Sequence, residues 1–325
     1  MNIPNSLASY ERLRSAPLTV NLNRGSSVES THRVHAVVSD EKGRVLLNAG
    51  QADYLTFIRS ALKPFQALPF INSGTAEKIA CRDKGIAICC SSHNGSTKHA
   101  REAFKILWSS DLNVDLLQCP IPKGCRSPLE HNCSGKHSAF LATCKKMKWP
   151  LDNYLDGKHP LQLEIFRRVS ELLGQPYEEF IAARDDCGAP TILLNLSQMS
   201  VLYAHLSKSS HADLEQISRS MVSHPELISG DGLFDTELMR RSHLQIISKG
   251  GAEGIQCMAK VGDGLGIAIK VEDGSKRAKH AVALHILRQL DWITPSALQE
   301  LEEQILLLSP GVQLEVKGQL KFQQN

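Results

Sequence analysis

The sequence predicts an α+β fold in which an antiparallel sheet is built from both ends of the chain and the middle is mostly helical. Apolar, β-branched runs at 32–40 and 44–50 flank the turn residues Glu-Lys-Gly, a pattern typical of a β-hairpin. Strand patterns return at 243–249, 254–260 and 265–271. Because two early strands and three late strands need partners, we expect them to pair in one sheet with helices packed against it.

The residues between these strands have the spacing of helices, broken by Gly/Pro-rich loops. Residues 86–90 are an exception, because this short apolar run predicts a buried strand. We expect one domain over residues 1–325, with possible lobes formed by about 20–58 plus 243–325 and by about 59–242. The predicted helices are 60–72, 97–109, 134–148, 160–174, 190–207, 211–223, 231–242 and a closing helix at 275–293.

Composition and charge favour a globular protein with a small-molecule substrate. The 325 residues are 42% hydrophobic and 22% charged, and a net charge of +3 is too mild to indicate nucleic-acid binding. No window is apolar enough to span a membrane, and the amino terminus lacks the order of a signal peptide, so we expect a cytoplasmic protein. The nine cysteines lack the spacing of a disulfide framework, which indicates reduced thiols.

Ser60 and Lys63 are the first candidate catalytic residues. Positions three apart lie on one face of a helix, so the lysine could take the proton of the serine hydroxyl and make it a nucleophile. Pro64 places Ser60 near the start of the helix, where the amide dipoles favour negative charge. A solvated helix start is the alternative, since this spacing is common by chance.

Two further segments carry candidate residues of the same kind. Ser92 and His93 lie in a polar loop, 91–95, that also has the composition of a turn or helix cap. Lys249 ends a late strand and is followed by two glycines, a loose analogue of the lysine that lines the site of serine acyl-transfer enzymes. An exposed lysine in a hairpin turn is the alternative for this second segment.

Cysteine and histidine residues indicate a possible metal site. The segments 131–140 and 184–190 contribute Cys133, His137 and Cys187, and thiolate and imidazole are the ligands that zinc prefers. Buried cysteines with no ligand role are the alternative.

Taken in order, the segments "VESTHRVHAVVSD", "RSALKPFQALP", "SSHNGSTKH", "HNCSGKHSAF", "DDCGAPT", "GDGLFDTELM" and "KGGAEG" resemble the L-asparaginase II family, from about residue 20 to about residue 290. The resemblance implies hydrolysis of L-asparagine to L-aspartate and ammonia on a fold similar to serine β-lactamases and glutaminases. It also implies two serine–lysine pairs, Ser60 with Lys63 and Ser92 with Lys249. Either serine could attack the amide carbon, and a homodimer is expected.

The resemblance further implies a zinc ion held by Cys133, Lys136 and Cys187, whereas the chemistry of zinc ligands keeps His137 as the rival to the lysine. Substrate binding is assigned to His93, to Asp185 for the α-ammonium group and to Arg59 for the α-carboxylate. Related activities on glutamine or a β-lactam, and a non-catalytic zinc- or asparagine-binding protein, are the alternatives.

The chain departs from the family pattern at two positions. Asp186 stands where the family usually has glycine, and Ser96 stands where it has glutamate. Both changes bear on substrate preference and rate more than on the class of reaction.

Overall fold

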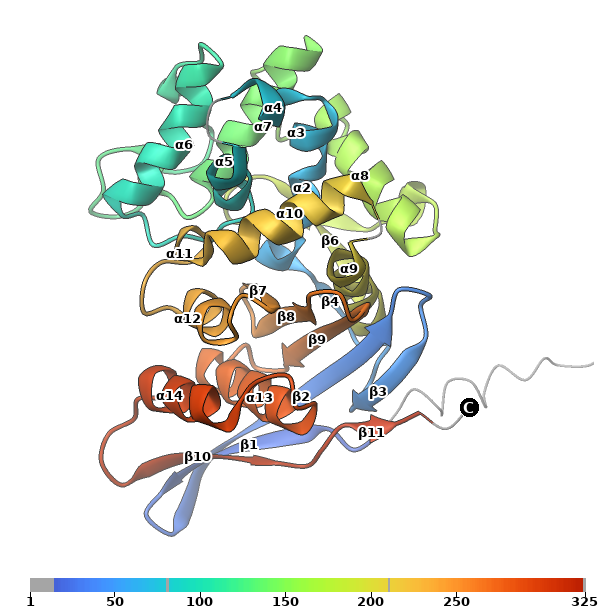
Figure 1. The fold of residues 1–325 in the computed structure, drawn as a ribbon, viewed down its shortest axis with the longest axis vertical. Helices are drawn as coiled ribbons and strands as arrows, with labels where there is room; N and C mark the ends of the chain where they lie inside the picture. The colour runs from blue at the N-terminus through green and yellow to red at the C-terminus, as the bar shows by residue number, and fades with distance from the viewer. Residues whose placement is uncertain (1–14, 80–81, 210, 324–325) are drawn as a thin grey trace, which may run out of the picture. The chain divides into compact units, whose positions relative to one another are not determined.

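The computed structural model describes residues 15–79, 82–209 and 211–323 (Figure 1), and the α+β prediction is confirmed. The amino-terminal residues on which the expectation about a signal peptide rests lie outside these ranges. The chain divides into two compact units. Unit 1 comprises residues up to 56, 194–208 and 250 onward, and unit 2 comprises 57–193 and 209–249.

Unit 1 contains an antiparallel sheet centred on β2, a strand long enough to pair along both of its edges. Its residues pair with β9 on one side, and with β1 and then β3 on the other. The strand order continues outward to β10 beyond β1 and to β8 beyond β9, and β11 pairs with β3. The strands are β1 (Leu18–Arg24), β2 (Ser27–Asp40), β3 (Val45–Ala49), β8 (Ile255–Lys260), β9 (Leu265–Val271), β10 (Val312–Lys317) and β11 (Lys321–Phe322).

Helices of unit 1 cover both faces of this sheet. Successive residues of a strand point to opposite faces, and every residue of β2 from Val34 to Asp40 is buried. Helices α9 (Leu196–Lys208) and α13 (Lys276–Gln289) both pack against β2 and β9, and α14 (Pro295–Ile305) packs on α13. Gly266 allows the close approach of α9, because a Cβ at this position would lie 2.0 Å from the carbonyl oxygen of Ser200.

Unit 2 is mainly helical and is built around α7 (Ser134–Met147). Eleven of the fourteen residues of this helix are buried, so it has no solvated face of the usual width. Gly135 lies where α7 meets α5 (Arg82–Cys89), since a Cβ there would be 2.1 Å from the carbonyl oxygen of Ile88.

The helices of unit 2 and its short strand have the following bounds: η1 (Arg59–Leu62), α2 (Lys63–Gln66), α3 (Leu68–Asn72), α4 (Thr75–Lys78), α5 (Arg82–Cys89), α6 (Thr97–Ser109), η2 (Val114–Leu116), η3 (Pro128–Glu130), α7 (Ser134–Met147), α8 (Pro160–Leu173), η4 (Tyr177–Glu179), β5 (Ala182–Arg184), α10 (Ala212–Ser223), α11 (Pro225–Ile228) and α12 (Phe234–Arg241). Strands β4 (Leu55–Phe57), β6 (Pro190–Asn195) and β7 (Ile246–Gly250) include the residues at which the chain passes from one unit to the other.

Two element predictions were wrong, and each has a local cause. Residues 86–90 belong mostly to helix α5 rather than to a strand, because a short apolar run fits a buried helix as well as a strand. The predicted helix 190–207 is β6 followed by α9. Asn195 separates them, since its side chain accepts hydrogen bonds from Ser197 Oγ at 2.7 Å and from Gln198 N at 2.8 Å, which caps the helix.

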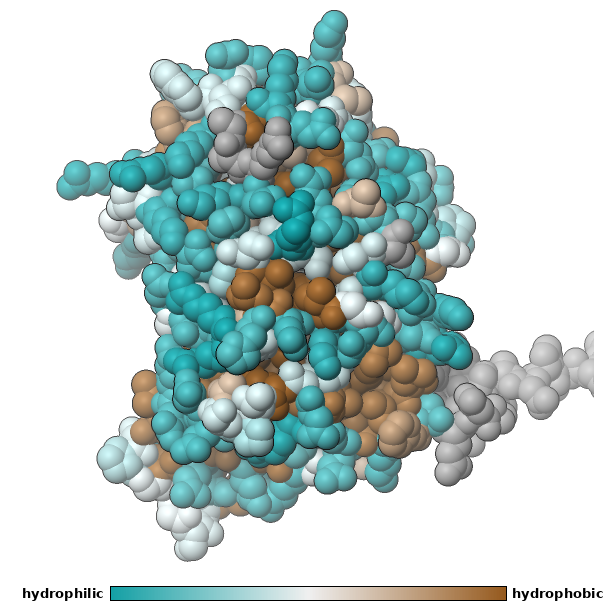
Figure 2. Space-filling model, in the orientation of Figure 1, coloured by the Kyte–Doolittle hydropathy of each residue, from teal (hydrophilic) through white to brown (hydrophobic). Residues whose placement is uncertain are grey.

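The hairpin of β2 and β3 and the three late strands are confirmed. The predicted closing helix corresponds to α13, but α14, β10 and β11 follow it. Residues 194–208, placed in the expected helical lobe, belong to unit 1. Figure 2 shows a largely hydrophilic surface, with hydrophobic side chains gathered where Figure 1 draws β2 and β3. No helix among the described residues is long and apolar enough to cross a membrane.

Candidate active site

Two buried lysines of unit 2 converge on the hydroxyl of Ser92. Lys63 Nζ lies 2.9 Å from Ser92 Oγ, and Lys249 Nζ lies 2.8 Å from the same atom. Lys63 comes from α2 and Lys249 from β7, and both residues are 0% exposed, whereas Ser92 is partly exposed. A serine hydroxyl within hydrogen-bond reach of an amine has the geometry of an activated nucleophile or of a proton carrier.

Backbone carbonyl groups hold Lys63 in this position. Its Nζ also donates to Ser91 O at 2.5 Å and to Asn132 O at 3.3 Å. The backbone of Ser92 is fixed as well, because its N–H donates to Ile228 O at 2.8 Å. That N–H is therefore not free to stabilise an oxyanion.

Ser60 lies in η1 and is partly exposed. Its carbonyl oxygen accepts the backbone N–H of Lys63, so the two residues are joined through the main chain. Within the described residues, Ser60 Oγ makes no hydrogen bond with Lys63 Nζ. The structure thus brings together Ser92, Lys63 and Lys249, and places the Ser60 hydroxyl outside their hydrogen bonds.

His93 follows Ser92 and is buried beneath the loop. Its Nδ1 accepts the N–H of Gly95 at 3.1 Å, so the proton is on Nε2, which donates to Ser134 Oγ at 3.0 Å. Burial, together with the neighbouring His99 and Lys63, lowers the pKa of His93 well below its ordinary value. The imidazole is therefore neutral, and it positions the loop that carries Ser92.

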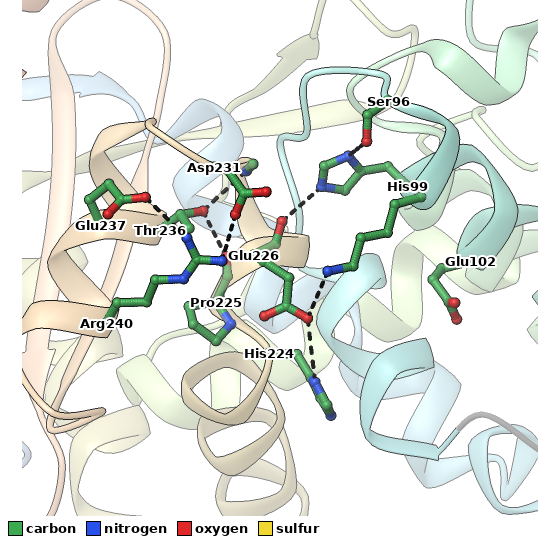
Figure 3. Close-up of polar contacts among 12 residues, drawn as sticks. Ser96, His99, Glu102, His224, Pro225, Glu226, Asp231, Thr236, Glu237 and Arg240 are labelled. Atoms are coloured by element: carbon green, nitrogen blue, oxygen red, sulfur yellow. Dashed lines mark hydrogen bonds and ion pairs between the residues drawn. The ribbon is translucent and has the colours of Figure 1, made fainter.

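His99 stacks on His93, with ring centroids 4.8 Å apart and planes 4° from parallel. Figure 3 shows Ser96 pointing at His99, where its hydroxyl lies 2.7 Å from Nδ1, while His99 Nε2 donates to the carbonyl oxygen of Glu226 at 2.9 Å. Ser96, one of the two departures from the family pattern, therefore holds a histidine in place.

Charged side chains around the Glu226 segment extend this network. Lys98 Nζ lies 3.3 Å from a carboxylate oxygen of Glu226, and Arg240 pairs with Asp231 at 2.5 Å and with Glu237 at 3.1 Å (Figure 3). The Lys98–Glu226 pair joins α6 to α11, and the Arg240–Asp231 pair ties α12 to the loop that follows α11. They fix the segment whose carbonyl groups hold Ser92 and His99.

Arg59, next to Ser60, is paired with two aspartates. Its Nε donates to Asp185 at 2.8 Å, and its Nη2 donates to Asp186 at 2.6 Å. Burial opposes the charge of Arg59, but Asp185 and Asp186 raise its pKa above the ordinary value. Both residues predicted to hold the two ends of an amino-acid substrate thus contact each other directly.

The cysteine, lysine and histidine residues predicted as metal ligands also lie together in unit 2. Lys136 Nζ lies 3.3 Å from Cys187 Sγ. Cys133 and the nearby Lys136 lower the pKa of Cys187 despite its burial, whereas Cys187 and burial raise the pKa of Cys133. These neighbours therefore favour the thiolate form of Cys187.

The donor atoms fit a zinc ion in their chemistry. Two sulfur atoms and one nitrogen atom are ligands that Zn²⁺ accepts, and Cys133, Lys136 and Cys187 supply them. His137 stays the rival ligand. Its Nδ1 is bonded to Tyr154 Oη at 2.8 Å, while its Nε2 is buried without a hydrogen-bond partner in the part of the chain that the structure describes. Within the described residues, no group of three His, Cys, Asp or Glu side chains is arranged to hold a metal. Burial lowers the pKa of His137 to about 4, so this side chain is neutral.

A separate cavity of about 420 Å³ lies in unit 2, lined by residues 155–157, 182–184, 188 and 190 together with Gln118. None of the predicted catalytic, substrate-binding or ligand residues lines it. It is adjacent in sequence to Cys187 through Gly188, but it is distinct from the Ser92 centre.

A family model described as L-asparaginase II matches residues 20–322, nearly the whole chain. The chain belongs to the L-asparaginase II family. The resemblance drawn from the seven sequence segments is confirmed. No curated protein matches the sequence.

Solved structures similar to this L-asparaginase II family member are distant in sequence. Mglu in its native form is 13% identical with a TM-score of 0.47, over 80% of this chain and 65% of its own. A β-lactamase from Mycobacterium bovis is 13% identical with a TM-score of 0.46, over 84% of this chain and 95% of its own. A Bacillus glutaminase is 10% identical with a TM-score of 0.41, over 80% of this chain and 91% of its own.

Sequence reasoning missed residues of this family member that hold the candidate site residues in place without being candidates themselves. Asn132 and Ser134 lie inside the segment "HNCSGKHSAF" already quoted for its ligands, yet they serve Lys63 and His93. A signal for Ser134 existed, because a polar residue beside a predicted ligand on a buried helix needs a partner. The role of the Asn132 carbonyl group had no sequence signal, since every residue has one.

Proposed function

We propose that the chain is an amidohydrolase that cleaves the side-chain amide of L-asparagine to give L-aspartate and ammonia. The observation that carries this proposal is the position of Ser92 Oγ, within 2.9 Å of Lys63 Nζ and 2.8 Å of Lys249 Nζ. Membership of the L-asparaginase II family supports the choice of an amide substrate. Two buried amines on one hydroxyl are costly to bury, and proton transfer is a function that would justify them.

The reaction proceeds by acyl transfer. A serine hydroxyl attacks the amide carbon, and an uncharged lysine amine accepts its proton as the tetrahedral intermediate forms. The lysine then gives that proton to the amide nitrogen, so that ammonia leaves and an ester remains on the serine. Water hydrolyses the ester in the same way, with the lysine taking a proton from water and the serine recovering its own.

Ser92 is the hydroxyl with the required contacts, and Ser60 is the second candidate for the attack. Two observations favour attack by Ser60, with Ser92 passing the proton between the lysines and the leaving nitrogen. They are the Ser60-x-x-Lys63 spacing and the backbone N–H of Ser92, which is already hydrogen-bonded. A diazoketone analogue of asparagine would label the attacking serine. Peptide mapping by mass spectrometry would then place the label on the peptide of Ser60 or on that of Ser92.

The proposal includes a zinc ion held by Cys133, Lys136 and Cys187. A bound zinc ion would supply positive charge and fix the loop that carries Asp185. Burial lowers the pKa of Lys136, but Cys187 and Cys133 outweigh it and raise the pKa, so the amine carries a proton that the metal would replace.

Ammonia release from L-asparagine and L-glutamine by the purified protein, with ring opening of a β-lactam followed by absorbance, tests the proposed activity. L-Asparagine is expected to be the best of the three by kcat/KM. Faster turnover of the glutamine or of the β-lactam would overturn the substrate assignment. Asparagine bound but not hydrolysed would instead identify a binding protein. A homodimer, expected from the resemblance, is tested by light scattering.

A further inference from the structure

The main chain and the side chain of Arg59 are both fixed. The residue has φ of +52°, in the left-handed region that non-glycine residues seldom adopt, and its N–H donates to Thr191 Oγ1 at 3.0 Å. Its side chain is 16% exposed. An unusual backbone conformation held by a hydrogen bond and by burial points the guanidinium group in one direction.

Two different carboxylates already occupy the edge of the Arg59 guanidinium group that usually binds a single carboxylate. A single carboxylate normally takes two parallel N–H donors, but here Asp185 takes Nε at 2.8 Å and Asp186 takes Nη2 at 2.6 Å. The two aspartates differ in their surroundings. Asp185 is 9% exposed and also accepts the N–H of Asp186 at 2.8 Å, whereas the side chain of Asp186 is 89% exposed.

The exposure of Asp186 shows that burial does not hold its carboxylate on Arg59. The side chain is free to face solvent, and it is nevertheless paired with a guanidinium group that is mostly covered. Asp185 interacts with Lys136 as well as with Arg59, because its charge helps to raise the pKa of Lys136, after the charges of Cys187 and Cys133. Arg59 and the two aspartates together carry a net negative charge, which disfavours the approach of another anion.

Arg59 is close in the chain to the residues of the proposed reaction. It precedes Ser60 and lies four residues before Lys63, whose amine contacts Ser92. If Arg59 binds the substrate α-carboxylate, a substrate whose amide reaches Ser92 would place its α-carboxylate and α-ammonium groups beside Arg59, Asp185 and Asp186. Asp185 suits an α-ammonium group, while Asp186 occupies a donor that an α-carboxylate would use.

We propose that Asp186 competes with the substrate α-carboxylate for Arg59, so that this site accepts asparagine-type amides whose α-carboxyl group is blocked and uncharged. The inference rests on the proposed function for the identity of the substrate, but the competition itself is a matter of binding. Removal of the Asp186 charge would weaken its hold on Nη2 and leave Asp185 in place for the ammonium group. Discrimination would then shift toward the free amino acid.

Calorimetric binding of L-asparagine and L-asparagine amide, which has a neutral α-carboxamide, tests the proposal without requiring turnover. The proteins are the full chain, Asp186→Asn and the control Asp111→Asn. Asp111 has an equally exposed side chain, at 95%, and pairs with Lys145 at 3.7 Å in the same unit. The preference for L-asparagine over its amide should rise about two- to fivefold in Asp186→Asn, the range expected for one exposed charge pair, and should not change in the control.

A double-mutant cycle with Arg59→Gln separates competition from a general effect on the loop. In the Arg59→Gln background, the shift caused by Asp186→Asn should fall below about twofold, because the contested donor is gone. A shift of the same size in both backgrounds would overturn the proposal, as would an Asp186→Asn preference equal to that of the control. Failure of both compounds to bind the full chain and Asp186→Asn would overturn it too.

Ammonia release by the same proteins reports separately on the proposed function. If the full chain binds both compounds and Asp186→Asn shifts their ratio, yet neither is hydrolysed, the competition stands and the proposed activity falls. If both are hydrolysed and the binding ratio does not shift, the activity stands and the role of Asp186 falls.

Discussion

Replacement of Ser92 by alanine should abolish the proposed reaction while leaving the protein folded. The variant removes the one oxygen atom that contacts Lys63 at 2.9 Å and Lys249 at 2.8 Å. Whether Ser92 attacks or passes the proton, general acid–base transfer through it contributes about 10²- to 10⁴-fold. We therefore expect kcat for L-asparagine to fall by about 10³-fold or more, with a smaller change in KM.

The neighbouring serine provides a matched control. Ser91 is buried and its Oγ donates to Ile88 O at 2.7 Å, away from both amines, so Ser91→Ala should keep kcat within about threefold of the parent. Lys63 keeps its two carbonyl acceptors in Ser92→Ala, and the cost in folding free energy should be about 1–3 kcal/mol. Urea denaturation followed by circular dichroism would check that cost.

Initial rates of ammonia release, measured below the unfolding midpoint of every variant, decide the result. If folded Ser92→Ala retained more than about a tenth of the parent kcat, the two short contacts would have no part in catalysis. The reaction would then have to be assigned to Ser60 and to a proton route that does not include Ser92.

Three further predictions concern stability, metal and pH. Gly135→Ala should destabilise the protein by about 1–3 kcal/mol in thermal denaturation, because its Cβ would lie 2.1 Å from a backbone oxygen of α5, whereas Gly157→Ala, with no atom within 4 Å, should change little. Cys187→Ser should lose most bound zinc in metal analysis, and Cys144→Ser, on α7, should retain it; equal zinc contents would contradict the proposed ligands. Burial lowers the pKa of His99, so the unfolded chain binds more protons and the free energy of unfolding should fall as pH drops below about 6.5. In urea denaturation, His99→Phe should show a smaller difference in this free energy between pH 7.5 and pH 5.5 than the parent does. An unchanged difference would assign the pH dependence to other groups.

The fold class could be predicted because period and chain order survive in the sequence. β2 and β3 are apolar, β-branched runs that flank a turn, and the late strands are also rich in such residues, so their pairing followed from the need to cover their edges. β10 alternates regularly, with every second residue partly covered, but from the sequence we predict no strand beyond the closing helix. The strand prediction for residues 86–90 was wrong for a different reason, since their apolar run fits a buried helix as well as a buried strand.

The residues of the site could be predicted as candidates, but their pairing could not. The sequence spacing joined Ser60 to Lys63, whereas the structure directs Lys63 Nζ to Ser92. Side-chain direction over three residues depends on whether the segment is α or 3₁₀ helix, and η1 changes to α2 at Lys63. The contact of Arg59 with Asp186 joins residues 127 positions apart and had no local signal.

Because β2 pairs with β9, the sheet of unit 1 can be completed only late in the synthesis of the chain. Val34 pairs with Val271, so the central strand of unit 1 has one edge without its final neighbour until β9 (Leu265–Val271) has been made. At about 5–20 residues per second, that interval is on the order of tens of seconds. During it, an apolar strand with an open edge is a target for chaperones and for the same strand of a second nascent chain. Variants that slow translation between β2 and β9 should therefore aggregate more, even where the finished protein is equally stable.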